Sequence, residues 1–228
     1  MINDILSFSI NQDFRLDRWI HFQKQIKRYG LEFLNTKHKT PVSRHYLSTT
    51  KRFKRTKLSE MSNVHTFGEC IKEARACKAK MVLTFEDDVY FIDKDSASII
   101  KNVLEELPDK FGVCYLGCYI RSKPSKCSIV KHSAYLLQLK GVKFSIWGAH
   151  AVIWHESIYD LVIDEIFNTS KPMITDSLIY KKIVNGGVHN CFVAKPMIAF
   201  QNGELASNSM HGNFPFEKMK ERSLKVIC

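Results

Sequence analysis

The chain has 228 residues, of which 45% are hydrophobic, and a formal net charge of +11. This length and composition allow a sizeable buried core, and no run approaches the ~20 consecutive apolar residues of a membrane-spanning helix. Residues 1–10 lack the basic start, long apolar stretch and cleavage site of a secretory signal, so we expect a cytoplasmic protein without a membrane span.

Strands and helices alternate along the chain. In chain order we expect a strand at 4–10, a helix from about 16 to 30, a strand at 31–34, a helix at about 64–77, a strand at 80–85, a helix at 96–108, strands at 111–119 and 147–154, helices at 155–167 and 175–187, and a strand at 188–194. Asn11 or Asp13 could cap the first helix, and Ser62 the second. This alternation predicts an α/β fold with a mainly parallel central sheet, as one domain over residues 1–228.

The segment 35–58 accounts for most of the excess of positive over negative charge. From residue 36 to 58 there are eight lysines or arginines and no acidic residue. We expect a mobile basic loop that lies near the donor or acceptor of a reaction. Nucleic acid is the rival partner, but the segment has only Tyr46 and Phe53 as aromatic residues, whereas single-strand binders interleave more of them.

The seven cysteines are scattered and form no C-x-x-C pair. No Cys/His set has zinc-finger spacing, and the number is odd. We therefore interpret the cysteines as reduced thiols in a reducing compartment.

The stretch TFEDDVYF at 84–91 places three consecutive carboxylates, Glu86, Asp87 and Asp88, at the end of a strand. Three like charges between apolar flanks repel one another and lose hydration unless a cation compensates them. In an extended segment Glu86 and Asp88 project to the same side, and ligands of α/β sheets bind at the carboxyl ends of strands. The pattern favours a divalent cation bound by oxygen ligands. A solvated polar strand end is the alternative.

This stretch resembles the hallmark of glycosyltransferase family 25, the lipopolysaccharide and procollagen galactosyltransferase group. Further segments are similar in order along most of the chain: SINQDFRLDRW at 9–19, FGVCYLG at 111–117, WGAHAVIWHESIYDLV at 147–162, KPMITDSLI at 171–179 and AKPMIAFQNGELAS at 194–207. The resemblance implies a glycosyltransferase-A fold, a nucleotide-sugar donor and Mn²⁺ or Mg²⁺.

Cofactor-binding candidates lie near the first helix and in the acidic stretch. Arg15 and Arg18 are three residues apart near the helix start, where a guanidinium and the helix dipole both favour an anion. They could also be surface arginines. Asn11 could contact the base or ribose of a donor, or it could only cap the helix. Glu86 and Asp87 complete this set, with Asp87 near the ribose or held structurally.

For the metal we expect Asp88 as a ligand together with Glu86. His211 is a weak candidate for a third ligand, ahead of His189. We expect His150 to be a buried histidine within a strand.

The catalytic candidates are Asp176 and Asp87. The resemblance implies inversion at the anomeric carbon, which needs a general base, and Asp176 matches the family's aspartate. A helix cap by Thr175 or Asp176 is the competing interpretation.

The sequence therefore predicts a metal-dependent glycosyltransferase that moves a hexose, galactose or glucose, from a UDP-sugar to a glycan or glycoprotein acceptor. A basic metal-dependent nuclease, or a phosphate-binding nucleic-acid module, is the alternative.

Overall fold

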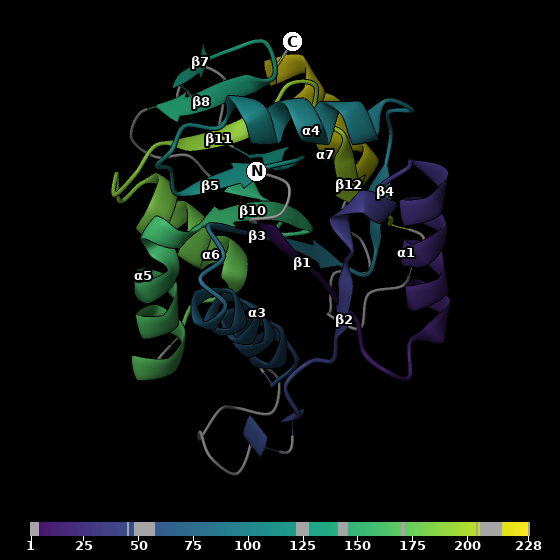
Figure 1. Ribbon diagram of the computed structural model, residues 1–228, viewed down its shortest axis with the longest axis vertical. Helices are drawn as coiled ribbons and strands as arrows, with labels where there is room; N and C mark the ends of the chain where they lie inside the picture. The colour runs from purple at the N-terminus through teal and green to yellow at the C-terminus, as the bar shows by residue number, and fades with distance from the viewer. Residues whose placement is uncertain are drawn as a thin grey trace.

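The computed structural model describes residues 5–44, 46–47, 58–121, 128–140, 146–169, 172–203, 205 and 216–227. Its centre is an eight-stranded sheet (Figure 1), with the strand order β2-β1-β3-β10-β5-β11-β8-β7. In that order the strands span Lys37–Lys39, Ile5–Ile10, Met81–Glu86, Ala151–His155, Val113–Tyr115, Cys191–Ala194, Leu136–Lys140 and Ser128–Lys131.

Six of the eight strands run in the same direction, and only β10 and β8 run against them. The predicted α/β class with a mainly parallel sheet is therefore confirmed. The pairings are nevertheless mixed, because β10 lies between β3 and β5 and is antiparallel to both. As a result, the start of β10 meets the carboxyl end of β3.

Helices cover both faces of the sheet. On one face lie α1 (Leu16–Arg28) and α4 (Ser96–Glu106). On the other lie α3 (Leu58–Ala76), α5 (Tyr159–Ile163) and α6 (Thr175–Leu178). The last two continue as π-helical turns over Asp164–Asn168 and Ile179–Val184. A strand buried on both faces needs apolar residues at successive positions, and β3 is buried from Met81 to Phe85.

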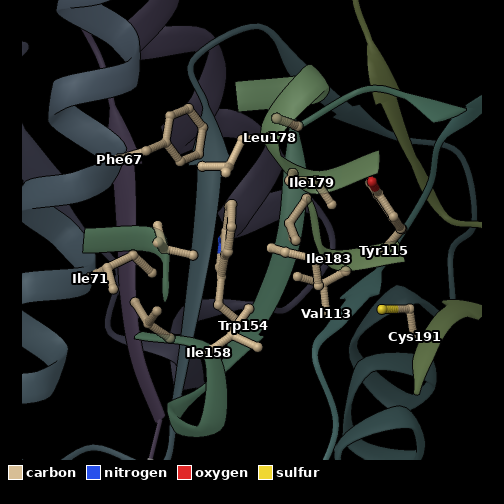
Figure 2. Packing of buried hydrophobic residues seen from close by; sticks show 14 of the residues in the cluster. Phe67, Ile71, Val113, Tyr115, Trp154, Ile158, Leu178, Ile179, Ile183 and Cys191 are labelled. Atoms are coloured by element: carbon tan, nitrogen blue, oxygen red, sulfur yellow. The ribbon is translucent and has the colours of Figure 1, made fainter. Parts of the chain in front are cut away.

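The core beneath α3 and α6 is built around Trp154 of β10. Figure 2 shows its indole among side chains from α3, α6 and β5, with Phe67 on the helix side. The ring centroids of Phe67 and Trp154 lie 6.1 Å apart. The indole nitrogen donates a 2.8 Å hydrogen bond to the hydroxyl of Thr84, so the one polar atom of this buried ring is paired. This packing fixes β10 against β3.

Two short ribbons and a last helix complete the fold. β4 (Val89–Phe91) pairs with β12 (Ala199–Gln201), and β6 (Tyr119–Ile120) pairs with β9 (Ile146–Trp147). Helix α7 (Phe216–Ile227) contacts β6, where the Ser223 hydroxyl accepts a 2.8 Å hydrogen bond from the Ile120 amide. No helix among the described residues is both long and apolar enough to cross a membrane.

Several sequence expectations were wrong in detail. Residues 31–34 were expected to form a strand, but Glu32–Leu34 is a 3₁₀ turn. The next strand is β2, inside the basic segment, so 35–58 is not a loop throughout. Its lysines suit an edge strand, where charge discourages further pairing. Residues 48–57 of that segment lie outside the described part of the chain.

The predicted helix caps were also wrong. The N-cap of α1 is Arg15, so neither Asn11 nor Asp13 caps that helix. Ser62 lies inside α3, where its hydroxyl donates to the Val42 carbonyl. The pattern also did not predict β7, β8, β12 or α7.

Candidate active site

The acidic stretch lies where β3 ends. Glu86 is the last residue of β3, and Asp87 and Asp88 form the turn into β4. Burial, followed by the charge of Asp88, raises the pKa of Glu86 to about 8, and burial raises the pKa of Asp88 to about 6. Burial also raises the pKa of Asp87, although Arg18 opposes this effect. Three carboxyl groups are therefore held together in a place that disfavours their charged forms.

Arg18 partly compensates this negative charge. One of its guanidinium nitrogens lies 2.7 Å from Asp87 Oδ1 and 3.8 Å from Asp88 Oδ2. The other donates a 3.2 Å hydrogen bond to the carbonyl of Leu205. Arg15, at the N-cap of α1, donates two hydrogen bonds to Asp17, at 2.9 and 2.7 Å. Both predicted arginines therefore lie on the α1 side of the acidic stretch, with Arg18 in direct contact.

Glu86 is held by two side-chain amides. Asn63 of α3 donates to its Oε1 at 3.1 Å, and Gln201 of β12 donates to its Oε2 at 2.9 Å. A side-chain hydrogen bond from Gln201 also lowers the pKa of Asp88. Glu86 thus accepts hydrogen bonds from two amides, while Asp87 contacts Arg18.

Sequence reasoning did not single out Asn63 or Gln201. Gln201 lies within the closing segment that carries the family resemblance, so that signal was present. No sequence signal marked Asn63, because a polar residue next to an expected helix cap, here Ser62, is common.

Asp176 lies in the first turn of α6 and contacts the chain before β10, which is on the other side of β3 from β1. Its Oδ1 accepts a 2.9 Å hydrogen bond from the Gly148 amide, just before β10. Its charge helps to raise the pKa of Glu86, which places the two carboxyl groups near each other. The N-cap of α6 is Ile174, and no side chain caps the helix there. The cap interpretation of Thr175 and Asp176 is therefore wrong.

Asn11 follows β1, one strand away from Glu86. Its side chain is buried, and its Oδ1 has no hydrogen-bond partner within the described residues. Its Nδ2 lies 3.5 Å from the ring of His38 on β2.

His150 is fully buried, and its Nε2 lies 3.0 Å from the Ala199 carbonyl. Burial lowers the pKa of His150 to about 4, so it is neutral at pH 7. His211 lies outside the described residues.

The carboxylates fit a divalent cation only with help from other ligands. Among the residues that the structure describes, no group of three or more His, Cys, Asp or Glu side chains is arranged to hold a metal ion. However, Asp88 Oδ1 is buried and has no partner in the described structure, and Mg²⁺ and Mn²⁺ prefer oxygen ligands. One or two carboxylates suit a cation that completes its shell with water and a diphosphate.

Fold and site together define a mixed α/β protein with a buried acidic centre between arginines and a further aspartate. No family model and no curated protein matches the chain. Among solved structures, it is similar to a mannose-1-phosphate geranyltransferase from Thermus thermophilus, with 9% identity over 84% of this chain and 73% of that one and a TM-score of 0.47. An inositol-1-phosphate CTP transferase from T. maritima has 15% identity, covers 84% and 66%, and has a TM-score of 0.39. Membership of glycosyltransferase family 25 stays a prediction.

Proposed function

We propose that the protein is a metal-dependent glycosyltransferase that moves a hexose from a UDP-sugar to a glycan or glycoprotein acceptor. One observation carries this proposal: the partnerless oxygen of Asp88 is buried beside Glu86, with Arg18 in contact on one side and Asp176 near Glu86 on the other. A cation and a diphosphate would supply the charges that such a centre needs.

The donor would lie between α1 and the end of β3. Arg15 and Arg18 would bind the diphosphate, since guanidinium groups bind phosphate oxygens in pairs of hydrogen bonds. The Oδ1 of Asn11, which has no hydrogen-bond partner among the described residues, would accept a hydrogen bond from the base or ribose. Asp87, fixed by its 2.7 Å contact with Arg18, would lie near the ribose.

Asp88 and Glu86 would hold Mn²⁺ or Mg²⁺. When bound, the cation would stabilise the negative charge that develops on the leaving diphosphate. The amides of Asn63 and Gln201 would keep Glu86 in place, because each of its oxygens already accepts a hydrogen bond.

Asp176 would take the proton from the acceptor hydroxyl as the new glycosidic bond forms. The hydrogen bond from the Gly148 amide to its Oδ1 would orient the carboxylate for this transfer. Because Asp176 contacts the chain before β10 and the arginines proposed for the diphosphate lie at the start of α1, the attacking oxygen and the leaving diphosphate would lie on opposite sides of the sugar. This arrangement is what inversion requires.

The basic segment is proposed as a loop on the donor or acceptor side rather than a nucleic-acid site. Two of its lysines already pair with Glu73 of α3: Lys39 at 2.8 Å and Lys37 at 3.4 Å. Because both lysines already have an acidic partner, they are less available to the phosphates of a nucleic acid than the total charge of the segment suggests.

Metal-dependent hydrolysis of the donor tests the proposal. The purified protein is incubated with UDP-galactose or UDP-glucose, and UDP and free hexose are followed by mass spectrometry. We expect slow release with Mn²⁺ and none with EDTA. Cleavage of an oligonucleotide under the same conditions, without release of UDP from either donor, would replace the transferase by a nuclease.

A further inference from the structure

The ribbon β6/β9 carries an aromatic residue, Trp147, just before the backbone that contacts the acidic centre. Trp147 ends β9, and the amide of the following residue, Gly148, donates to Asp176. Two residues further, the His150 carbonyl accepts a 3.0 Å hydrogen bond from the Glu86 amide. The backbone after Trp147 is thus bonded to the carboxylate of Asp176 and to the backbone amide of Glu86, two residues that the proposed function places at the reaction.

The side chain of Trp147 shares a face of the ribbon with Tyr119. Trp147 pairs directly with Tyr119 across the ribbon, and directly opposed residues of antiparallel strands share a face. The Tyr119 hydroxyl accepts a 3.2 Å hydrogen bond from the Gln201 amide, and the Gln201 side chain donates to Glu86. Tyr119, the cross-strand partner of Trp147, is therefore linked through Gln201 to the acidic centre.

Arg121 places a cation over this indole. Its guanidinium carbon lies 4.3 Å from the centroid of the Trp147 ring. The side chain of Arg121 is exposed, and Trp147 is partly exposed. Within the described residues no carboxylate forms an ion pair with Arg121, and its backbone carbonyl is held by Arg222 of α7 at 3.3 Å. An exposed cation with no acidic partner in the described part of the chain suits an anion.

We propose that Trp147 and Arg121 form an acceptor subsite for an acidic saccharide, a sugar ring that carries a carboxylate or a phosphate group. This inference rests on the proposed function. The indole offers a flat apolar surface for the C–H face of a sugar ring. The guanidinium binds the anionic group, because a charge-assisted hydrogen bond is stronger than an exposed cation–π contact.

The position of the pair favours the acceptor over the donor. β3 lies between β1 and β10 in the sheet. The residues proposed for the donor follow β1 or begin α1, whereas Trp147 precedes β10, and the next residue, Gly148, contacts Asp176. A sugar on the indole would therefore present its hydroxyl from the side of the proposed base.

A binding experiment tests the subsite without donor or metal. The chain has three tryptophans, so a ¹⁵N-labelled protein gives three indole N–H signals, and Trp147→Phe identifies the one from Trp147. The protein is titrated with glucuronic acid, glucose 6-phosphate, glucose and inorganic phosphate. We expect the Trp147 signal to respond to both acidic sugars at concentrations about 10- to 100-fold below those needed for glucose. Inorganic phosphate alone should not move it at those concentrations.

Arg121→Gln should abolish this preference, whereas the matched control Lys131→Gln should keep it, since Lys131 is an exposed cation on β7 at the far edge of the sheet. Equal responses to glucose and the acidic sugars, a preference that survives Arg121→Gln, or an equal response to inorganic phosphate would each overturn the subsite. Failure of donor hydrolysis by the unmodified protein would overturn the proposed function instead. The two failures are therefore distinguishable.

Discussion

Replacing Asp88 by asparagine should show how much stability the buried charge costs and, separately, whether metal-dependent turnover needs that charge. The two side chains have the same shape, so the substitution opens no cavity. In the protein without metal, the Asp88 carboxylate is buried, and one of its oxygens has no partner among the described residues. We expect Asp88→Asn to abolish metal-dependent turnover and yet to make the metal-free protein more stable at pH 8.

The magnitude follows from the pKa. Burial raises the pKa of Asp88 from 3.8 to about 6, which corresponds to about 3 kcal/mol between the two protonation states. A carboxyl whose pKa is raised by folding costs no stability below pH 3.8 and its full cost above about pH 6. The wild-type protein should therefore lose this stability as the pH rises from 4 to about 7, and the asparagine variant should not.

Urea unfolding in EDTA at pH 4, 5, 6, 7 and 8 measures this difference. We expect the free energy of unfolding of Asp88→Asn, relative to wild type, to rise by about 2–3 kcal/mol between pH 4 and pH 8. A difference that does not change with pH would refute the explanation of the buried charge. Metal-dependent release of UDP by the variant at a wild-type rate would refute the role of Asp88 as a ligand.

Three further predictions concern the neighbours of this centre. Arg18→Gln should lower the free energy of unfolding by about 3 kcal/mol, because it leaves the Asp87 carboxylate buried without its cation; a loss below about 1 kcal/mol in urea unfolding would mean that the pair is effectively solvated. Asp176→Asn can still accept the hydrogen bond from Gly148, so it should fold normally but transfer sugar at least ~100-fold more slowly, with unchanged donor affinity by calorimetry; near-normal turnover would exclude a general base. Gly117→Ala should cost more than about 3 kcal/mol or prevent folding, because its Cβ would lie 1.7 Å from a backbone oxygen of β12; a thermal melt like that of wild type would contradict the close approach.

The sheet and its helices could be predicted because burial imposes a pattern on them. The strand that ends at Glu86 is apolar at successive positions, since helices cover both of its faces. Where the apolar pattern was short or interrupted by charge, the prediction failed, since Leu31 and Leu34 are buried but four residues do not distinguish a strand from a turn. The apolar residues at 31–34 form a 3₁₀ turn, and β2 was missed because its charged side chains lie at the edge of the sheet.

The sequence predicted the residues of the acidic centre but not the side chains that hold them in place. The strand end and the three carboxylates are visible in the sequence, and so are the arginines near the start of α1. Asn63 and Gln201 contact Glu86 from 23 and 115 positions away in the chain. No local pattern marks an amide for such a contact, because the packing of α3 and β12 against β3 creates it.

The position of the cation is the most direct test of the proposed metal-dependent transfer. Crystals grown with Mn²⁺ and UDP allow the metal to be located by its anomalous scattering. We predict a peak about 2.0–2.2 Å from an oxygen of Asp88 and in contact with the diphosphate, which itself lies toward Arg15 and Arg18. A UDP molecule bound with its cation away from Glu86 and Asp88, or bound tightly with no cation at all, would contradict it.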